Sequence, residues 1–185
     1  SSRIEIGLAL AKSGVHLLVE KPISVSTKSV KKLIEICAEK NLILSLGYNL
    51  RFYESLIYFR DQLNLEVIGK PLLVKSEVGQ FLPSWRESVD YRNSVSAHRK
   101  LGGGVLFELS HEIDYLEWIF GKINWVRATI MQQSSLEIDV EDSAFLTFGI
   151  ENKKNSHLVA NLTMDFIRHD NQRNCIVIGE SGTLK

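Results

Sequence analysis

The sequence predicts an α/β protein in two parts: a small doubly wound parallel sheet, then an α+β part with a large, mostly antiparallel sheet. Two observations carry this prediction. Up to residue 48, helical patterns alternate with short apolar runs joined by short connections. From residue 122 onward, strand-like runs follow one another without intervening helices. We therefore place a boundary between residues 1–48 and 49–185.

The first part reads helix, strand, helix, strand. Residues 4–14 carry apolar side chains at helical spacing and end on a glycine, which is typical of a helix C-terminus. An apolar run at 16–20 predicts a short buried strand. An amphipathic helix follows, for which Ser26 or Thr27 is the expected N-cap. Residues 42–48 then form the second expected strand.

The second part begins with an expected helix at 52–64 and a strand at 72–81 that alternates apolar and polar residues. Residues 82–101 show little periodicity, and a loop of this length in a compact domain is usually functional or disordered. Its aromatic residues and arginines argue against plain disorder. Three glycines at 102–104 let the backbone turn into a helix expected over 104–120. The remaining strands are expected in the runs WVRATIMQQ, SAFLTFGI, HLVANLTMDF and NCIVIG.

Composition excludes several classes of partner. Lys plus Arg equals Asp plus Glu at 22 each, so no net field attracts nucleic acid or an anionic membrane. No apolar run approaches the roughly 20 residues of a membrane span, and no signal peptide opens the chain. We therefore expect a cytoplasmic protein with no nucleic-acid or membrane partner. Cys37 and Cys175 lie in apolar patterns and are most simply buried thiols, with a disulfide as the alternative.

The strand at 16–20 stops abruptly on Glu20-Lys21-Pro22. The carboxyl ends of parallel strands are where open α/β sheets bind ligands, so this stretch is a candidate site. Pro22 restricts Lys21 to extended backbone conformations and gives its side chain a defined direction. The alternative interpretation is a surface ion pair between Lys21 and Glu20 or Glu39.

The expected helix at 104–120 carries a second candidate group. Residues three and four apart are neighbours on a helix, so Glu108, His111 and Tyr115 are expected on one stripe. A carboxylate beside an imidazole orients the ring and raises its basicity, which suits a general base. The alternative is a solvated polar helix face. A metal site is not expected, because Tyr115 stands where a zinc protease helix has its second histidine and no second di-iron motif occurs.

Five motifs then occur in order: VEKP at 19–22, GYNLRF at 47–52, GKP at 69–71, LGGGVLFELSHEIDYL at 101–116 and GESGTL at 179–184. Together they resemble the Gfo/Idh/MocA oxidoreductases, which include glucose–fructose oxidoreductase and inositol dehydrogenase. The resemblance implies that residues 1–48 are the C-terminal portion of a Rossmann-like NAD(P)-binding domain. Residues 49–185 would be a substrate-binding and dimerisation domain, truncated at its C-terminus. No G-x-G-x-x-G occurs among the twelve glycines, so we expect a fragment.

The resemblance also implies a dehydrogenase that uses NAD or NADP and acts on a sugar, nucleotide sugar or polyol. Lys21 would hydrogen-bond the reacting oxygen and His111 would be the general base. Glu108 would support His111, although only two residues separate this acid from the histidine where many members have three. Further expected contacts are Glu20, Pro22 and Arg51 for the cofactor, and Trp85, Arg86, Tyr91, Arg92 and Tyr115 for the substrate.

Four expectations complete this interpretation. The 82–101 loop carries Arg86, Arg92, His98 and Arg99, whose donors suit phosphate and carboxylate, so a nucleotide sugar or acidic sugar is favoured over a neutral polyol. Without a glycine-rich loop the pyrophosphate has no helix N-terminus, so the chain alone should be inactive and bind dinucleotide weakly. Relatives suggest a cis peptide bond before Pro22 and a homo-oligomer formed through the second sheet. The competing hypothesis is a non-catalytic ligand-binding or dimerisation module on the same fold.

Overall fold

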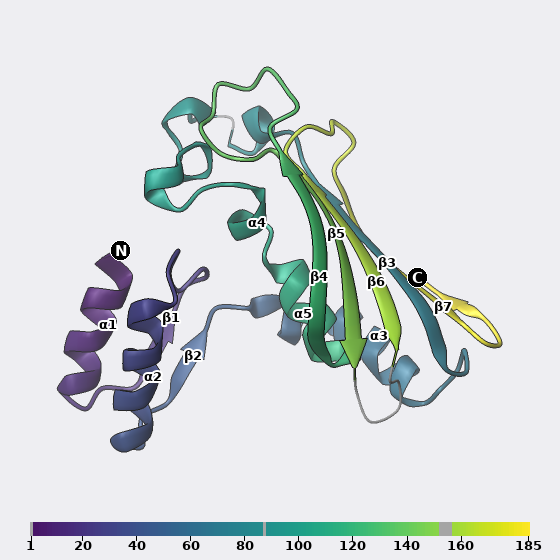
Figure 1. Ribbon diagram of the computed structural model, residues 1–185, viewed down its shortest axis with the longest axis horizontal. Coiled ribbons are helices and arrows are strands. Elements are labelled where there is room, and N and C mark those ends of the chain that lie inside the picture. The colour runs from purple at the N-terminus through teal and green to yellow at the C-terminus, as the bar shows by residue number, and fades with distance from the viewer. Residues whose placement is uncertain (1, 87, 152–156) are drawn as a thin grey trace. The chain divides into compact units, whose positions relative to one another are not determined.

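The structure is a computed structural model that describes residues 2–86, 88–151 and 157–185. The chain divides into two compact units, Ser1–Asn49 and Leu50–Lys185, called here the N-terminal and the C-terminal unit. Their helices and strands are labelled in Figure 1. None of the helices in the described residues is long and apolar enough to cross a membrane.

The N-terminal unit contains two helices and two short strands, in the order predicted. The elements are α1 (Ser2–Lys12), β1 (Leu17–Val19), α2 (Lys28–Glu39) and β2 (Leu44–Leu46). Strands β1 and β2 pair in parallel, with Leu17 opposite Leu44. A small core of Ile4, Ala11, Leu17, Leu33 and Cys37 lies between these elements. The predicted parallel α/β arrangement is therefore confirmed.

The expected cap of α2 is divided between two residues. Thr27 occupies the N-cap position, but its side chain makes no capping hydrogen bond. Instead, the Ser26 hydroxyl accepts the backbone N–H of Lys28 at 3.4 Å. Farther along α2, Cys37 is buried as a free thiol, and Cys175 of the C-terminal unit is also free. The alternative of a disulfide is therefore wrong.

The C-terminal unit is built on a six-stranded sheet in the order β4-β5-β6-β3-β7-β8. All neighbouring strands are antiparallel except β3 and β6, which run parallel. The predicted mostly antiparallel sheet is confirmed, and only the short β8 was not expected. The strand bounds are Pro71–Gly79 (β3), Lys122–Met131 (β4), Ser143–Glu151 (β5), Leu158–Asp165 (β6), Gln172–Gly179 (β7) and Thr183–Leu184 (β8).

Three helices cover one side of this sheet: α3 (Glu54–Asn64), α4 (Val105–Glu108) and α5 (His111–Phe120) (Figure 1). The main core lies between them and the sheet, and its fully buried side chains include Val74, Leu116, Leu162, Met164 and Phe166. Burying each of these side chains contributes roughly 1.5–3 kcal/mol relative to exposure. The sheet and α5 therefore form one packed body.

The single helix expected over 104–120 is two helices, and this part of the prediction was wrong. Helix α4 ends at Glu108, and Leu109 leaves the α-helical conformation with φ −103° and ψ 23°. The Ser110 hydroxyl donates to the carbonyl of Phe107 at 3.0 Å, a local bond of the kind that competes with the helical ladder. Glu108 and His111 consequently lie on different helices, and the spacing rule for one helix does not relate them.

The triple glycine before α4 is required by the backbone. Gly102 and Gly104 have φ of 86° and 105°, which disfavour any residue with a Cβ. A Cβ on Gly103 would collide with the carbonyl oxygen of Val95, and one on Gly104 would collide with the carboxylate of Glu141. The motif therefore lets the chain pass closely between its neighbours as it enters α4.

Candidate functional site

The two strands of the N-terminal unit end side by side. The backbone N–H of Gly47, just after β2, donates to the carbonyl of Val19 at the end of β1 over 2.8 Å. A Cβ on Gly47 would lie 3.0 Å from the carboxylate of Glu20, so the Glu20 side chain lies close against this glycine. The Glu20-Lys21-Pro22 stretch therefore occupies the carboxyl edge of a parallel pair, where ligands bind in open α/β sheets.

The backbone next to Lys21 is bonded to helix α1. The Lys21–Pro22 peptide bond is cis, as expected. The carbonyl of Pro22 accepts a hydrogen bond from Arg3 Nη1 on α1 at 2.9 Å. Lys21 itself is partly exposed, so its side chain is accessible to a ligand.

In the C-terminal unit, His111 begins α5 and is partly exposed. The same first turn carries two carboxylates that each bind an arginine from another element. Glu112 is fully buried and accepts from Arg173 Nε of β7 at 2.7 Å. Asp114 accepts from Arg51 Nε and Nη2 at 2.8 and 2.6 Å. These pairs fix the turn that carries His111, and acidic residues in a first turn also suit the helix dipole.

The predicted stripe of Glu108, His111 and Tyr115 was wrong, because Glu108 lies on α4 rather than α5 and Tyr115 faces the core. This side chain is only 3% exposed and faces the sheet, where its hydroxyl and that of Ser76 on β3 are 2.6 Å apart in a hydrogen bond. Burial raises the pKa of Tyr115 far above its ordinary value, and the neighbouring Cys175 adds to the effect. The phenol therefore stays neutral and serves the core.

Tyr115 does line one cavity of substrate size. A cavity of about 560 Å³ lies within the C-terminal unit, and Tyr53, Phe59, Tyr115, Arg173 and Cys175 contribute to its wall. Small-molecule sites typically have volumes of roughly 300–1,000 Å³. However, the Arg173 guanidinium is bonded to Glu112, and the Tyr115 hydroxyl is bonded to Ser76. The cavity thus offers volume, with these two polar groups already used.

In the described part of the 82–101 loop, the chain forms the short 3₁₀ turns Leu82–Ser84, Tyr91–Asn93, Val95–Ala97 and Arg99–Leu101. Most of its predicted substrate residues hold the loop in place. Trp85 packs edge-on against Phe166 with ring centroids 5.1 Å apart, and its Nε1 donates to the Gln80 carbonyl. The Tyr91 hydroxyl accepts the backbone N–H of Glu137 at 3.2 Å.

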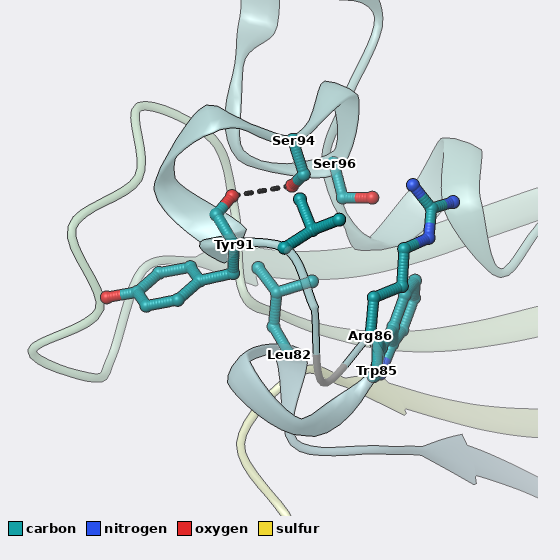
Figure 2. Close-up of a pocket in the computed structure, with 7 residues that line it drawn as sticks. Leu82, Trp85, Arg86, Tyr91, Ser94 and Ser96 are labelled. Carbon is teal, nitrogen blue, oxygen red and sulfur yellow. Dashed lines mark hydrogen bonds between the residues drawn. The ribbon is translucent and has the colours of Figure 1, made fainter.

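Arg92 forms ion pairs with Asp90 and Glu137, whereas Arg86 is exposed. Figure 2 shows Trp85 and Arg86 on one side of a small pocket and Ser94 and Ser96 on the other, with the Tyr91 ring turned away. The volume of this pocket is about 10 Å³, room for about one water molecule. Within the described residues, these loop side chains therefore enclose no sugar-sized space.

Sequence reasoning missed Glu112, Asp114 and Arg173. The available signal was the acidic run around His111, in which two further carboxylates follow the histidine within three positions. Their arginine partners lie about 60 residues away in the chain. Among the described residues, no group of three or more histidine, cysteine or acidic side chains is arranged to hold a metal ion.

The two units match the two domains of one protein family. Residues 58–185 match the GFO/IDH/MocA C-terminal domain. Residues 2–48 match the NAD-binding Rossmann fold of the oxidoreductase family. The chain belongs to the GFO/IDH/MocA oxidoreductase family, as its motifs indicated.

Known relatives are distant in sequence and close in fold. Levoglucosan dehydrogenase of Pseudarthrobacter phenanthrenivorans is 25% identical over 172 residues, which are 90% of this chain and 43% of that protein. The WlbA dehydrogenase of Bordetella pertussis, solved with NADH and UDP-GlcNAcA, has 18% identity and a TM-score of 0.82, covering 98% of this chain and 51% of that one. An inositol dehydrogenase homologue of Azotobacter vinelandii, solved with NADH and myo-inositol, has 17% identity and a TM-score of 0.77, covering 100% and 47%. The chain thus spans about half the length of these proteins.

Proposed function

We propose that the protein containing this chain transfers a hydride between a nicotinamide cofactor, NAD or NADP, and a sugar, nucleotide sugar or polyol. The observation that carries this proposal is the position of Lys21 at the carboxyl edge of the parallel strands β1 and β2, where Gly47 N–H bonds the Val19 carbonyl. That edge is where an open α/β sheet receives a ligand. The match of residues 2–48 to an NAD-binding fold supports the same assignment.

The residues of this edge fit the nicotinamide end of such a cofactor. Because Gly47 has no side chain, the Glu20 carboxylate can lie against it at this edge. Glu20, Lys21 and Pro22 would contact the cofactor there, and the bound nicotinamide would accept or supply the hydride. The sequence contains no G-x-G-x-x-G for the pyrophosphate. We therefore assign catalysis to the complete protein and expect the 185-residue chain by itself to be inactive.

In this proposal, two side chains act on the substrate. Lys21 donates a hydrogen bond to the reacting oxygen and stabilises the negative charge that develops there. A ring nitrogen of His111 accepts the hydroxyl proton as the alcohol is oxidised. Glu108, at the end of α4, supports the imidazole, and Arg51 remains a predicted cofactor contact.

The substrate class is proposed from the loop at 82–101. Arg86 is exposed there and its guanidinium suits phosphate or carboxylate, whereas Arg99 Nε and Nη2 donate to the Asp139 carbonyl at 3.2 Å. The relative from Bordetella pertussis was solved with a UDP-sugar that carries an acid. We therefore propose a nucleotide sugar or acidic sugar in preference to a neutral polyol.

Absorbance of NAD(P)H at 340 nm tests the proposal in the complete protein with UDP-sugars, CMP-sugars, free sugars and polyols. His111→Asn should lower kcat by about 10²–10⁴-fold with little change in cofactor binding. Lys21→Ala should lower kcat and also weaken binding, and Glu108→Gln should have a smaller effect. The control is His157→Asn, an exposed histidine outside the proposed site. Near-normal turnover in His111→Asn would refute the general base, and turnover of neutral polyols alone would refute the substrate class.

The open sheet supports a second role as an assembly surface. Strand β4 forms one edge of the sheet, and Trp125 and Phe145 on the face away from the helices are 45% and 43% exposed. Exposed aromatic residues at this density favour an interface. We propose that two copies associate through this face, and Trp125→Glu should then shift the mass measured by sedimentation from oligomer to monomer. An unchanged mass would contradict it.

A further inference from the structure

The pair formed by Arg51 and Asp114 joins two functionally distinct segments. Arg51 lies in the short 3₁₀ turn Asn49–Phe52, which begins at the last residue of the N-terminal unit. Asp114 lies three residues after His111 in the first turn of α5. The pair therefore connects the start of the C-terminal unit to the turn that carries the proposed general base.

The geometry of this pair is stronger than that of an ordinary surface ion pair. Two separate N–H groups of Arg51 reach the two carboxylate oxygens of Asp114 at 2.8 and 2.6 Å. The Asp114 side chain is only 9% exposed and that of Arg51 is 42% exposed. Bidentate guanidinium–carboxylate bonds fix orientation as well as distance, whereas isolated exposed pairs contribute little.

A second ion pair in the same unit offers a matched comparison. Arg60 and Asp61 on α3 make a single contact of 3.3 Å between neighbouring residues, and the Asp61 side chain is 51% exposed. The ion pair stays within α3, although Arg60 also lies over the Trp118 ring of α5, 4.2 Å from its centroid. Removing the Asp61 carboxylate changes the net charge by the same amount as removing the Asp114 carboxylate, but it does not alter the first turn of α5, which carries His111.

We propose that Arg51 and Asp114 are positioning residues, which hold the segment at 49–53 and the His111 turn in one fixed relation. This inference rests on the proposed function, because the turn matters for catalysis only if His111 is the base. Neither residue needs to contact the substrate. Their effect on His111 would be carried by the backbone of the first turn of α5, because Asp114 lies three residues after His111.

Hydrogen exchange on the 185-residue chain tests the contact without any activity. The Tyr53 N–H donates to the Leu50 carbonyl at 3.0 Å, so its protection reports whether this turn is held. In Asp114→Asn, exchange over residues 49–53 should rise about tenfold. The control Asp61→Asn should leave it unchanged. Unchanged exchange in Asp114→Asn would overturn the proposal.

Kinetics of the complete protein test the consequence for His111. Asp114→Asn and Arg51→Gln should each lower kcat about tenfold with a smaller change in the KM for substrate. The double variant should be no worse than either single one, because the two residues act as one unit. Arg51→Lys keeps the charge but loses the fork, so it should recover only part of kcat.

The two failures are distinguishable. If the wild-type protein shows no dehydrogenase activity while Asp114→Asn loosens residues 49–53, the proposed function is wrong and the pair still holds the turn. If wild-type activity is present and kcat is unchanged in both single variants, the positioning role is refuted. Since Arg51 is more exposed than Asp114, Arg51→Lys keeps the test decisive even if Asp114→Asn fails to fold.

Discussion

The buried pair of Glu112 and Arg173 makes an asymmetric prediction about stability. Glu112 has no exposed surface, whereas the Arg173 side chain is 49% exposed. The loss in the free energy of unfolding therefore depends on which of the two partners is removed. Arg173→Met leaves a carboxylate in the core without this cation, and Glu112→Gln leaves a guanidinium that can turn toward water.

The magnitudes follow from this difference in burial. Breaking a buried ion pair by removing one partner costs about 3–5 kcal/mol when the remaining charge stays buried. We assign that range to Arg173→Met. In Glu112→Gln the amide oxygen still accepts a hydrogen bond from the arginine, so the loss should be only about 1–2 kcal/mol. The double variant should be more stable than Arg173→Met alone.

Urea unfolding followed by tryptophan fluorescence can measure this difference in the 185-residue chain. All three tryptophans, at positions 85, 118 and 125, lie in the C-terminal unit. Excitation at 295 nm therefore reports the unfolding of that unit alone, even if the two units unfold separately. If Arg173→Met is no more destabilising than Glu112→Gln, the assignment of a buried, compensated carboxylate is wrong.

Two further predictions concern ionisable groups. Burial raises the pKa of Cys175 to about 12, so at pH 8 only about 10⁻⁴ of this thiol is ionised. Its alkylation in the folded chain should therefore be at least about 10³-fold slower than in urea. Mass spectrometry of the cysteine peptides measures both rates. Burial pushes the pKa of Asp142 upward, but hydrogen bonds from Ser134, Gln133 and Ser143 outweigh it and leave the pKa below its ordinary value. The stability that Asp142 contributes is therefore present above about pH 4 and is lost as pH falls through its folded pKa. Asp142→Asn should lower the free energy of unfolding in urea at pH 7 and make that free energy less dependent on acid pH. An equally steep loss of stability in acid in this variant would contradict the assignment.

Periodicity predicted the elements well because each one buries a continuous apolar face. The apolar residues that recur at helical spacing between positions 104 and 120 do pack into the core: Leu106, Leu109, Ile113, Leu116 and Ile119. The same spacing hid the break at residues 109–110. Apolar spacing records which side chains face the core, but a hydroxyl that interrupts the backbone ladder leaves that spacing unchanged.

The site was less predictable because its contacts are long-range. Trp85 and Tyr91 carried the residue types of a binding loop, yet their partners Phe166 and Glu137 lie 81 and 46 residues farther along the chain. Tyr115 was predicted beside Glu108 and His111 from helical spacing, and Ser76 on β3 satisfies its hydroxyl inside the core. A sequence shows which groups need partners, and only the fold shows where those partners are.

The two arginine pairs on α5 also bear on how a histidine there can act as a base. A general base must begin the reaction unprotonated. Two bare carboxylates within three residues of His111 would favour the protonated imidazole, because nearby negative charge stabilises a cation. Arg173 and Arg51 each bring a positive charge within 2.8 Å of one of these carboxylates, so neither carboxylate is bare. The same contacts that hold the first turn of α5 therefore also counter the charge of the two carboxylates that follow His111.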